Sequence, residues 1–392
     1  MELPNLILFD DPTIRGNLMP FTFTRPVSEI RIGILTITEK WELLLKQKAS
    51  FLTVHYLSEK YPLQQKEHNL YINGSVLPDA SLVEALGTLK SGEWLTSGNT
   101  IIAQAGHAFL SAPSASTKKR EYTQPYLQIK NLWDIFTLNG RAIEADFKYI
   151  TRGRSSQPAD PTNQVIGAEN IFIEPGAKVK CSVLNAETGC IFIGKDAEVM
   201  EGSLLRGPLA LCEHATVKMG AKIYGATTIG PAVKAGGEIN NSVFLGFCNK
   251  AHDGFIGNSV IGEWCNIGAD SNNSNLKNNY APVKLWHYPS RSFIDTGLQF
   301  CGLFMGDHSK CGINTMFNTG TVVGFSCNIF GAGFPRTFIP SFSWGGPAGF
   351  VRYQLDKAME TAERMMARRG LHLSAVDIAI WKHIYEQQTL DL

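Results

Sequence analysis

The chain lacks an excess of either charge. It has 36 Lys and Arg residues against 35 Asp and Glu residues, which gives a formal net charge of +1. Proteins that attract nucleic acid through its phosphates usually carry a surplus of basic residues, and this balance shows none. We therefore expect no nucleic acid among the partners.

Long apolar runs are also absent. No stretch reaches the roughly 18–20 apolar residues that a bilayer-spanning helix needs, so no membrane partner is expected. The first residues, MELPNLILFDD, carry an acid where a signal peptide would carry Lys or Arg, which favours a cytoplasmic location.

The cysteines show no paired spacing. All eight lie between Cys181 and Cys327, without a CxxC motif. They fall in a region rich in Gly, Val and Ile, where cysteine acts as a small buried apolar residue. This pattern indicates a reduced protein rather than a disulfide scaffold.

What the sequence does contain is a six-residue repeat. In FMGDHSKCGINTMFNTGTVVGFSCNIFG, residues 304–331, every sixth residue from Met305 to Ile329 is apolar, and small residues follow several of them. Neither a helix, with its period of 3.6, nor a strand, with its period of 2, repeats at six. Six residues make one short strand and a corner, so the repeat predicts a triangular solenoid, a hexapeptide-type parallel β-helix whose large residues point inward. The pattern recurs from Ile193, with irregular stretches at 233–256 and 270–300.

The rest of the chain divides around this repeat. Residues 1–150 alternate strand-like runs (LILF, FLTVHYL) with helical runs (ITEKWELLLKQ, DASLVEALGTL), which predicts an α/β domain. The polar insert SAPSASTKKREY, 111–122, is predicted to be a mobile surface loop. Residues 151–163 are predicted to be a linker and 164–347 the β-helix.

Residues 348–392 show a helical pattern. Gly370 is placed to end one helix, and Ser374 with Asp377 is placed to begin another. The last helix carries an apolar stripe that we expect to pack on the solenoid, and the expected role of the helices is to cap its open end. The stripe consists of Val376, Ile380 and Ile384.

One segment of the β-helix resembles a known family. NSVFLGFCNKAHDGFIGNSVIGEWCNIGA, residues 241–269, is similar to the acetyltransferase domain of GlmU-like bifunctional enzymes. Those enzymes acetylate glucosamine-1-phosphate and then form UDP-N-acetylglucosamine. Their left-handed β-helices assemble as trimers with active sites between subunits. The positions that match the family motif are Lys250-Ala251-His252, Phe255, Gly257, Ile261-Gly262 and Asn266-Ile267-Gly268-Ala269.

The resemblance implies roles for individual residues. His252 corresponds to the general base that removes a proton from the attacking amine, and Asn275 to a donor for the oxyanion. Acetyl-CoA would be the co-substrate, lying along Met305–Gly333, with Lys310 and Arg336 as the nearest cations for its phosphates.

The sugar-phosphate residues depart from the family pattern. Lys218 stands for an arginine and keeps the charge without the two-pronged guanidinium. Asn240 stands for a lysine, although Lys234 is close in sequence, and Phe255 replaces a tyrosine. Asn266 belongs to the same motif and is expected to contact substrate.

The first domain resembles sugar-phosphate nucleotidyltransferases. In ILFDDPTIRGNLMPFTFTRP, residues 7–26, Arg15 matches the loop arginine that meets the NTP phosphates. Asp10, Asp11 and Pro12 stand where the family has glycines. The lysine that follows the family's proline is Val27 here, so Arg25 or Arg31 would have to substitute for it.

The same resemblance implies magnesium. Asn73 and Asp134 stand at the positions of the two metal carboxylates, and Asp10 or Asp11 could assist. A Mg²⁺ ion would then neutralise charge as a sugar phosphate attacks an NTP.

Two readings stay open from the sequence. The leading hypothesis is a homotrimeric sugar-phosphate nucleotidyltransferase fused to an acetyltransferase, which forms a UDP-N-acetylglucosamine-type product for cell-envelope synthesis from small-molecule substrates. The alternative is a trimer that is non-catalytic, or only an acyltransferase, with a degenerate nucleotidyltransferase domain. A zinc hydratase on the same β-helix would need three clustered histidines, and the available ones show no closely spaced pair: His214, His252, His287 and His308.

Overall fold

The computed structural model describes residues 4–112 and 117–387. The chain forms two compact units, and two short segments near the N-terminus, 19–23 and 31–34, belong to the second unit. The first unit comprises Met1–Leu18, Thr24–Ile30 and Leu35–Asn131, and the second comprises Met19–Phe23, Arg31–Ile34 and Leu132–Leu392. No helix among the described residues is long and apolar enough to cross a membrane.

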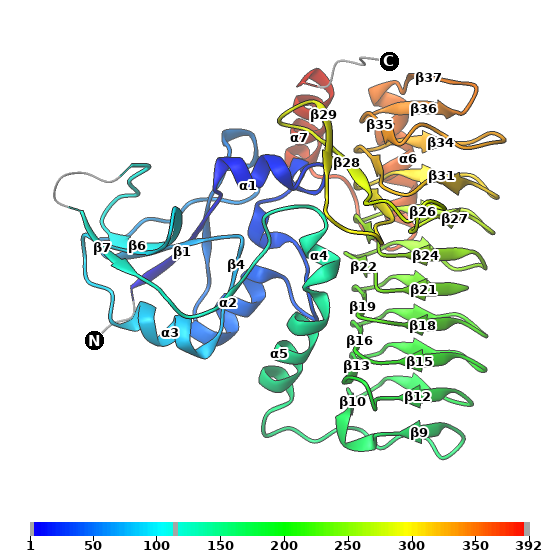
Figure 1. The fold of residues 1–392 in the computed structure, drawn as a ribbon, viewed down its shortest axis with the longest axis horizontal. Coiled ribbons are helices and arrows are strands. Elements are labelled where there is room, and N and C mark those ends of the chain that lie inside the picture. Colours follow the sequence, from blue (N-terminus) through cyan, green and yellow to red (C-terminus); the bar gives the residue numbers. More distant parts are fainter. Residues whose placement is uncertain (1–3, 113–116, 388–392) are drawn as a thin grey trace. The chain divides into compact units, whose positions relative to one another are not determined.

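The first unit is built on a mixed six-stranded sheet in the order β2-β1-β3-β6-β5-β7 (Figure 1). β1 is parallel to both β2 and β3, whereas β6 is antiparallel to β3 and β5. A separate antiparallel pair of strands, β4 with β8, belongs to the same unit. The strands are β1 (Asn5–Phe9), β2 (Ser50–Leu52), β3 (Asn69–Asn73), β4 (Val76–Leu77), β5 (Glu93–Ser97), β6 (Thr100–Gly106), β7 (Lys118–Glu121) and β8 (Leu127–Gln128).

Local capping explains where the helices of this unit begin. Asp11 caps α1 (Pro12–Asn17), and Asp79 caps α3 (Ala80–Gly87). α2 (Ile37–Leu45) begins with a capping box, in which Thr36 and Glu39 bond each other's backbone N–H groups. The two helices predicted from ITEKWELLLKQ and DASLVEALGTL are thereby confirmed.

Two expectations for this unit were wrong in part. FLTVHYL contributes only its first two residues to β2, and His55–Leu57 forms a 3₁₀ turn. Just after β2, the Thr53 hydroxyl donates to the Asp10 carboxylate at 2.6 Å. Within the predicted loop 111–122, Lys118–Glu121 forms β7, parallel to β5; residues 113–116 lie outside the described part.

Two helices of the second unit precede the solenoid, α4 (Asp134–Thr137) and α5 (Asn139–Thr151). The Asn139 side-chain oxygen accepts hydrogen bonds from the Gly33 N–H, at 2.7 Å, and from the Thr228 hydroxyl, at 3.1 Å. Asp146 accepts from the Ile34 N–H at 2.8 Å. These buried polar contacts fasten α5 and residues 31–34 to the side of the solenoid.

The solenoid is a parallel β-helix with three faces (Figure 1), so the predicted β-helix architecture is confirmed. The first face is a nine-stranded parallel sheet: β10 (Ile171–Ile173), β13 (Ile191–Ile193), β16 (Leu209–Leu211), β19 (Thr227–Ile229), β22 (Val243–Phe244), β25 (Val260–Ile261), β30 (Leu303–Met305), β33 (Thr321–Val323) and β35 (Phe338–Ile339).

The second face has ten strands, of which only the last is antiparallel. They are β11 (Lys178–Val179), β14 (Glu198–Val199), β17 (Thr216–Val217), β20 (Lys234–Ala235), β23 (Asn249–Lys250), β26 (Asn266–Ile267), β31 (Lys310–Cys311), β34 (Asn328–Ile329), β36 (Ser343–Gly346) and β37 (Gly349–Arg352). The third face holds β9 (Gln164–Ile166), β12 (Val183–Asn185), β15 (Leu204–Arg206), β18 (Lys222–Tyr224), β21 (Glu238–Asn240) and β24 (Phe255–Gly257), followed by the pair β27 (Asn272–Asn273) and β32 (Met316–Phe317).

The six-residue period has the predicted meaning. All five apolar residues of the repeat are at most 4% exposed, and they share one core with the inward residues of the other rungs. Burial of this continuous column is the main force that holds the rungs together. The five are Met305, Cys311, Phe317, Val323 and Ile329.

The supposed interruption at 233–256 is wrong, because strands β20 to β24 continue the stack there in register. The six-residue period breaks in the sequence because the rungs become shorter. The paired residues Leu211 and Ile229 are 18 positions apart, whereas the next pair, Ile229 and Phe244, is 15 positions apart. The stretch 270–300 leaves the coil only after β27, whose two residues still pair with β32 on the third face. It contains an antiparallel hairpin of β28 (Lys284–His287) and β29 (Ser292–Asp295) before β30 resumes the first face.

The C-terminal helices are α6 (Leu355–Ala367) and α7 (Ala375–Gln387). Gly370 adopts φ +70 after α6, and Ser374 and Asp377 exchange side-chain bonds at the start of α7, as predicted. Trp381 of α7 contacts the rings of Phe325 and Phe342 on consecutive rungs. The helices therefore lie along the side of the last rungs, and the expected end-capping role was wrong: the β36–β37 hairpin ends the stack.

Candidate functional site

His252 lies at the corner between β23 and β24, where its side chain is exposed. It lines a groove of about 780 Å³ together with Lys218, which is half-buried and follows β17. The structure therefore brings together two residues that the sequence analysis selected separately. The complete lining is Met200, Lys218, Met219, Gly237, Ala251, His252, Asp253, Ala269 and Asp270.

The groove follows one corner of the prism over successive rungs. Neighbouring corners approach so closely that a Cβ on Gly237, at φ +69, would come within 2.9 Å of the His252 carbonyl oxygen. The Asp270 N–H donates to the Asp253 carbonyl at 3.0 Å, which ties the His252 corner to the next rung. Backbone contacts thus hold the floor of the groove, and the imidazole projects from it.

Charges in the groove have both signs. Lys218 supplies one cation, and Asp253 and Asp270 supply two exposed carboxylates, which the sequence analysis did not select. A ligand with an amine and an anionic group would meet complementary charges here. Both acids stand at the same corner on consecutive rungs, and a search for polar residues at equivalent corners would have found them.

Lys250 departs from the inward apolar column. Its side chain is 1% exposed, and its ammonium donates to the carbonyls of Gly236 and Asp253 at 3.1 Å and to the carbonyl of His252. Burial lowers the pKa of Lys250 to about 8.

The other predicted substrate residues lie outside this groove. Phe255 and Asn275 flank Gly257 on the third face, and the Asn275 amide donates to Asn258 at 2.7 Å. Asn266, on the second face, accepts a hydrogen bond from the Asn249 amide at 2.9 Å.

Two further candidates for binding the sugar phosphate lie one rung before the rung that carries His252. Lys234 is exposed at the start of β20, and half-buried Asn240 ends β21 beside Gly257 in the ladder. Neither lines the groove of His252.

The expected acetyl-CoA cations differ in environment. The Lys310 ammonium donates to the His308 carbonyl at 2.7 Å, and burial lowers its pKa to about 8, whereas Arg336 is exposed.

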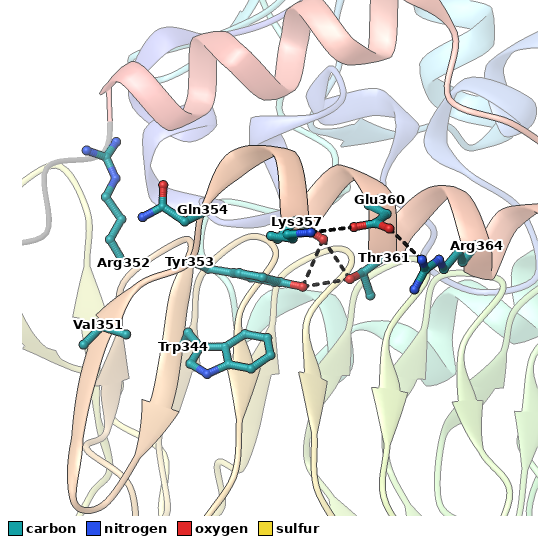
Figure 2. Close-up of a pocket in the computed structure, with 9 residues that line it drawn as sticks. All are labelled: Trp344, Val351, Arg352, Tyr353, Gln354, Lys357, Glu360, Thr361 and Arg364. Carbon is teal, nitrogen blue, oxygen red and sulfur yellow. Dashed lines mark hydrogen bonds and ion pairs between the residues drawn. The ribbon is translucent and has the colours of Figure 1, made fainter.

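A second pocket, of about 770 Å³, lies between the last strands and α6 (Figure 2). Trp344 and Tyr353 form its aromatic side, with ring centres 4.7 Å apart. Along α6, Glu360 pairs with Lys357 at 3.3 Å and with Arg364 at 2.6 Å. The sequence analysis missed this pocket because its residues come from a strand pair and a helix that meet only in the folded chain.

In the first unit, Arg15 is 4% exposed and held by several partners. Its guanidinium donates to Asp10 at 3.2 Å, to the Arg25 carbonyl at 3.1 Å and to the Tyr56 hydroxyl at 2.9 Å. Arg25 is buried as well. Burial raises the pKa of Asp10, against the opposing effect of Arg15. In this arrangement Arg15 links Asp10, Arg25 and Tyr56.

The residues expected to bind magnesium lie in different units. Asn73, 1% exposed in β3, uses its side-chain oxygen to accept from both the N–H and the hydroxyl of Ser75, at 3.1 and 2.7 Å. Both lone pairs are thus occupied, so Asn73 does not fit a metal ligand without rearrangement. Asp134 begins α4. Among the described residues, no group of three or more His, Cys, Asp or Glu side chains could hold a metal ion.

Comparison with known proteins agrees with both halves of the fold. Residues 6–155 match the sugar nucleotidyl transferase family. The chain is 31% identical over 121 residues, or 31% of its length, to a protein of Methanocaldococcus jannaschii named bifunctional protein GlmU. It is 25% identical over 232 residues, or 56% of its length, to a bifunctional sugar-1-phosphate nucleotidylyltransferase/acetyltransferase of Sulfurisphaera tokodaii. These matches span 27% and 49% of the relatives' own lengths.

Among solved structures, an N-acyltransferase from Bacillus cereus, AntD, in complex with dTDP and coenzyme A, matches 53% of this chain and 90% of its own, at 12% identity and a TM-score of 0.22. The Sulfurisphaera tokodaii relative is named as both a nucleotidylyltransferase and an acetyltransferase. The chain is thus a relative of the GlmU-like bifunctional nucleotidyltransferase/acetyltransferases, with a sugar nucleotidyl transferase segment followed by a parallel β-helix.

Proposed function

We propose that the β-helix transfers an acetyl group from acetyl-CoA to the amine of an amino-sugar phosphate. The observation that carries this proposal is the shared groove of His252 and Lys218. A base and a cation in one cleft suit a substrate that presents an amine and a phosphate. The acetyltransferase named in the Sulfurisphaera tokodaii relative supports the same reaction class.

The chemistry follows from the groove. The neutral imidazole of His252 accepts a proton from the sugar amine as its nitrogen attacks the thioester carbonyl. A C–N bond forms, and the carbonyl becomes an oxyanion, which an amide donor such as Asn275 would stabilise. The C–S bond then breaks, and the coenzyme A thiolate takes the proton that His252 received. Lys218 binds the phosphate, and the exposed imidazole has no hydrogen bond to another described residue that would hinder this proton transfer.

Asn275 lies on the third face, outside the groove of its own chain. We propose that the active protein is a homotrimer, in which Asn275, Asn240 and Phe255 of one subunit complete the groove of a neighbour. Lys234 and Asn266 keep their expected role as substrate contacts under this proposal.

For the co-substrate, we propose the pocket beside α6. Arg352, Lys357 and Arg364 offer charges for phosphates, and Trp344 offers a ring face for adenine (Figure 2). β36 stands four strands beyond β23, about 19 Å along the stack at the usual strand spacing, so an extended pantetheine arm could run from this pocket towards His252. Lys310 and Arg336 would lie along that path.

We propose that the nucleotidyltransferase half joins the sugar phosphate to a nucleotide and gives a UDP-N-acetylglucosamine-type product. The reaction would take place in the cytoplasm, and the product would serve cell-envelope synthesis. Arg15, Arg25 and a magnesium ion held by Asp134 are its expected parts. A second candidate function is an acyltransferase with a degenerate first domain. The internal bonding of Arg15 and of Asn73 favours this candidate.

The test of acetyl transfer uses wild type, His252→Gln and a matched control, His214→Gln, which changes another exposed corner histidine outside the groove. Release of coenzyme A from acetyl-CoA and glucosamine-1-phosphate should fall about 10²–10⁴-fold in His252→Gln and stay unchanged in the control. Full activity in His252→Gln would refute the assignment.

The phosphate and nucleotide sites need their own variants. Lys218→Ala should raise the KM for the sugar phosphate about tenfold or more, whereas Lys195→Ala, at an exposed corner, should not. Pyrophosphate release with an NTP and a sugar phosphate tests the first domain: Asp134→Ala should abolish it while coenzyme A release continues. If wild type releases no pyrophosphate, the degenerate-domain reading is correct.

A further inference from the structure

The inward column of the ten-stranded face contains a single charged side chain among apolar ones. At each rung, the last residue of the two-residue strand points into the prism and is buried. Lys250 takes this place in β23, between Ala235 of β20 and Ile267 of β26. The other inward residues of the column are Val179, Val199, Val217, Ala235, Ile267, Cys311 and Ile329.

A buried ammonium is costly unless polar groups surround it. Lys250 meets this requirement by donating to three backbone carbonyls, those of Gly236, His252 and Asp253, and it pairs with no carboxylate among the described residues. Two of the three belong to the corner that carries the proposed base. The third belongs to the corner of the preceding rung, whose Gly237 packs against the same backbone.

We propose that Lys250 is a positioning residue, whose ammonium acts as an internal strut that fixes the backbone of the 251–254 corner and thereby directs the His252 imidazole into the groove. This inference rests on the proposed acetyl transfer. It explains why a charge stands where every other rung buries an apolar or small side chain. An apolar residue would satisfy the column, but it would leave the corner carbonyls without a common donor.

The main test is Lys250→Met, which keeps the side-chain length and restores the apolar column. The melting temperature should stay equal or rise, because an apolar side chain replaces a buried charge of similar volume. The kcat for acetyl transfer should fall about 10- to 100-fold, since a misplaced base loses much of its contribution, while the KM for acetyl-CoA stays unchanged. Ile267→Val, one rung on, is the matched control, expected to lower stability slightly with kcat unchanged.

Hydrogen exchange of the peptide that covers residues 249–257 gives a readout that does not depend on activity. In Lys250→Met this peptide should exchange faster, with the neighbouring rungs unchanged. Lys250→Gln keeps a shorter donor and should lie between wild type and Lys250→Met in both exchange and kcat.

Three outcomes would overturn the inference: unchanged exchange at 249–257, an unchanged kcat, or faster exchange over all rungs with a lower melting temperature, which would make Lys250 a general stabiliser. If wild type transfers no acetyl group, the proposed function fails. Locally faster exchange in Lys250→Met would then still support the strut, and unchanged exchange would refute it.

Discussion

Buried charged side chains distinguish the two halves of this protein at the scale of single residues. In the first unit, Arg15 and Asp10 form an ion pair whose side chains are each 5% exposed. In the second, Lys250 is solvated by carbonyls alone. Arg15 has a carboxylate partner, whereas Lys250 has none within the described part of the chain, so the two cations should respond differently to substitution and to pH.

The stability contribution of Lys250 should depend on alkaline pH. Burial lowers the pKa of Lys250 to about 8 in the folded chain, below the ordinary lysine value of 10.5. Below pH 8 both states are protonated, and the cost of burying the charge is fully present. Between pH 8 and 10.5 the unfolded state binds more protons, so stability rises by up to about 1.4 kcal/mol per pH unit. Urea denaturation should show the free energy of unfolding of wild type rising relative to that of Lys250→Met between pH 8 and 10.5. A difference that does not change with pH would contradict the burial of a charged amine.

Loss of Asp10 should be more costly than loss of its neighbour. Asp10→Ala leaves the Arg15 guanidinium buried without its carboxylate, and we expect a loss of about 3–5 kcal/mol. Asp11→Ala removes only the N-cap of α1 and should cost about 1 kcal/mol. Chemical denaturation gives the free energy of unfolding of both variants. Equal losses would show that the Asp10–Arg15 ion pair contributes no more to stability than the N-cap does.

At the scale of elements, the corners of the β-helix decide where side chains project. Gly220 and Gly237 lie at corners of consecutive rungs with almost the same backbone angle, φ +68 and +69. Only Gly237 faces another backbone, that of the His252 corner; an added Cβ at Gly220 would meet no atom within 4 Å. Substitutions at these two glycines therefore distinguish the effect of backbone strain, which both share, from the effect of displacing the His252 corner, which only Gly237 has.

Gly220→Ala should cost about 1–2 kcal/mol, the usual penalty for a left-handed residue with a side chain, and leave acetyl transfer intact. Gly237→Ala carries the same penalty and must also displace residues 252–254, so we expect lower stability and a lower kcat. Thermal denaturation and coenzyme A release measure the two effects. Similar kinetics in both variants would show that the corner tolerates displacement.

At the scale of the whole molecule, the β-helix exposes large apolar side chains that a monomer would leave in water. Met219, which lines the groove of His252, is 70% exposed, and Ile313 is 71% exposed. Exposed apolar side chains can mark interaction surfaces, and three identical prisms can close around a threefold axis. This arrangement supports the proposed trimer.

Light scattering should therefore give three times 43.1 kDa for wild type. Ile313→Asp should shift the mass towards one subunit and reduce acetyl transfer, because the groove would lose its neighbour. Leu371→Asp, which changes a 41% exposed side chain between α6 and α7, is the control and should stay trimeric. A monomeric wild type at micromolar concentration would contradict the proposal.

Much of the fold could be predicted from local pattern. The six-residue period identified the inward residues of the β-helix, because burial selects apolar side chains at each rung regardless of distant contacts. The N-terminal cap of α7 was readable for the same reason, since a cap bonds only its own helix. His252 was found through a motif of contiguous residues, which a single corner and its flanking strands contain.

The sequence by itself thus determined the α/β segment and the solenoid, and it selected His252 as a candidate site residue. Only the tertiary structure decided that 233–256 continues the stack, that Lys218 shares the groove of His252, that Arg15 is bonded internally and that α6 and α7 lie along the side of the rungs. These features depend on contacts between residues far apart in the chain. A local period specifies which side chain points inward, but not which distant backbone or side chain it meets there.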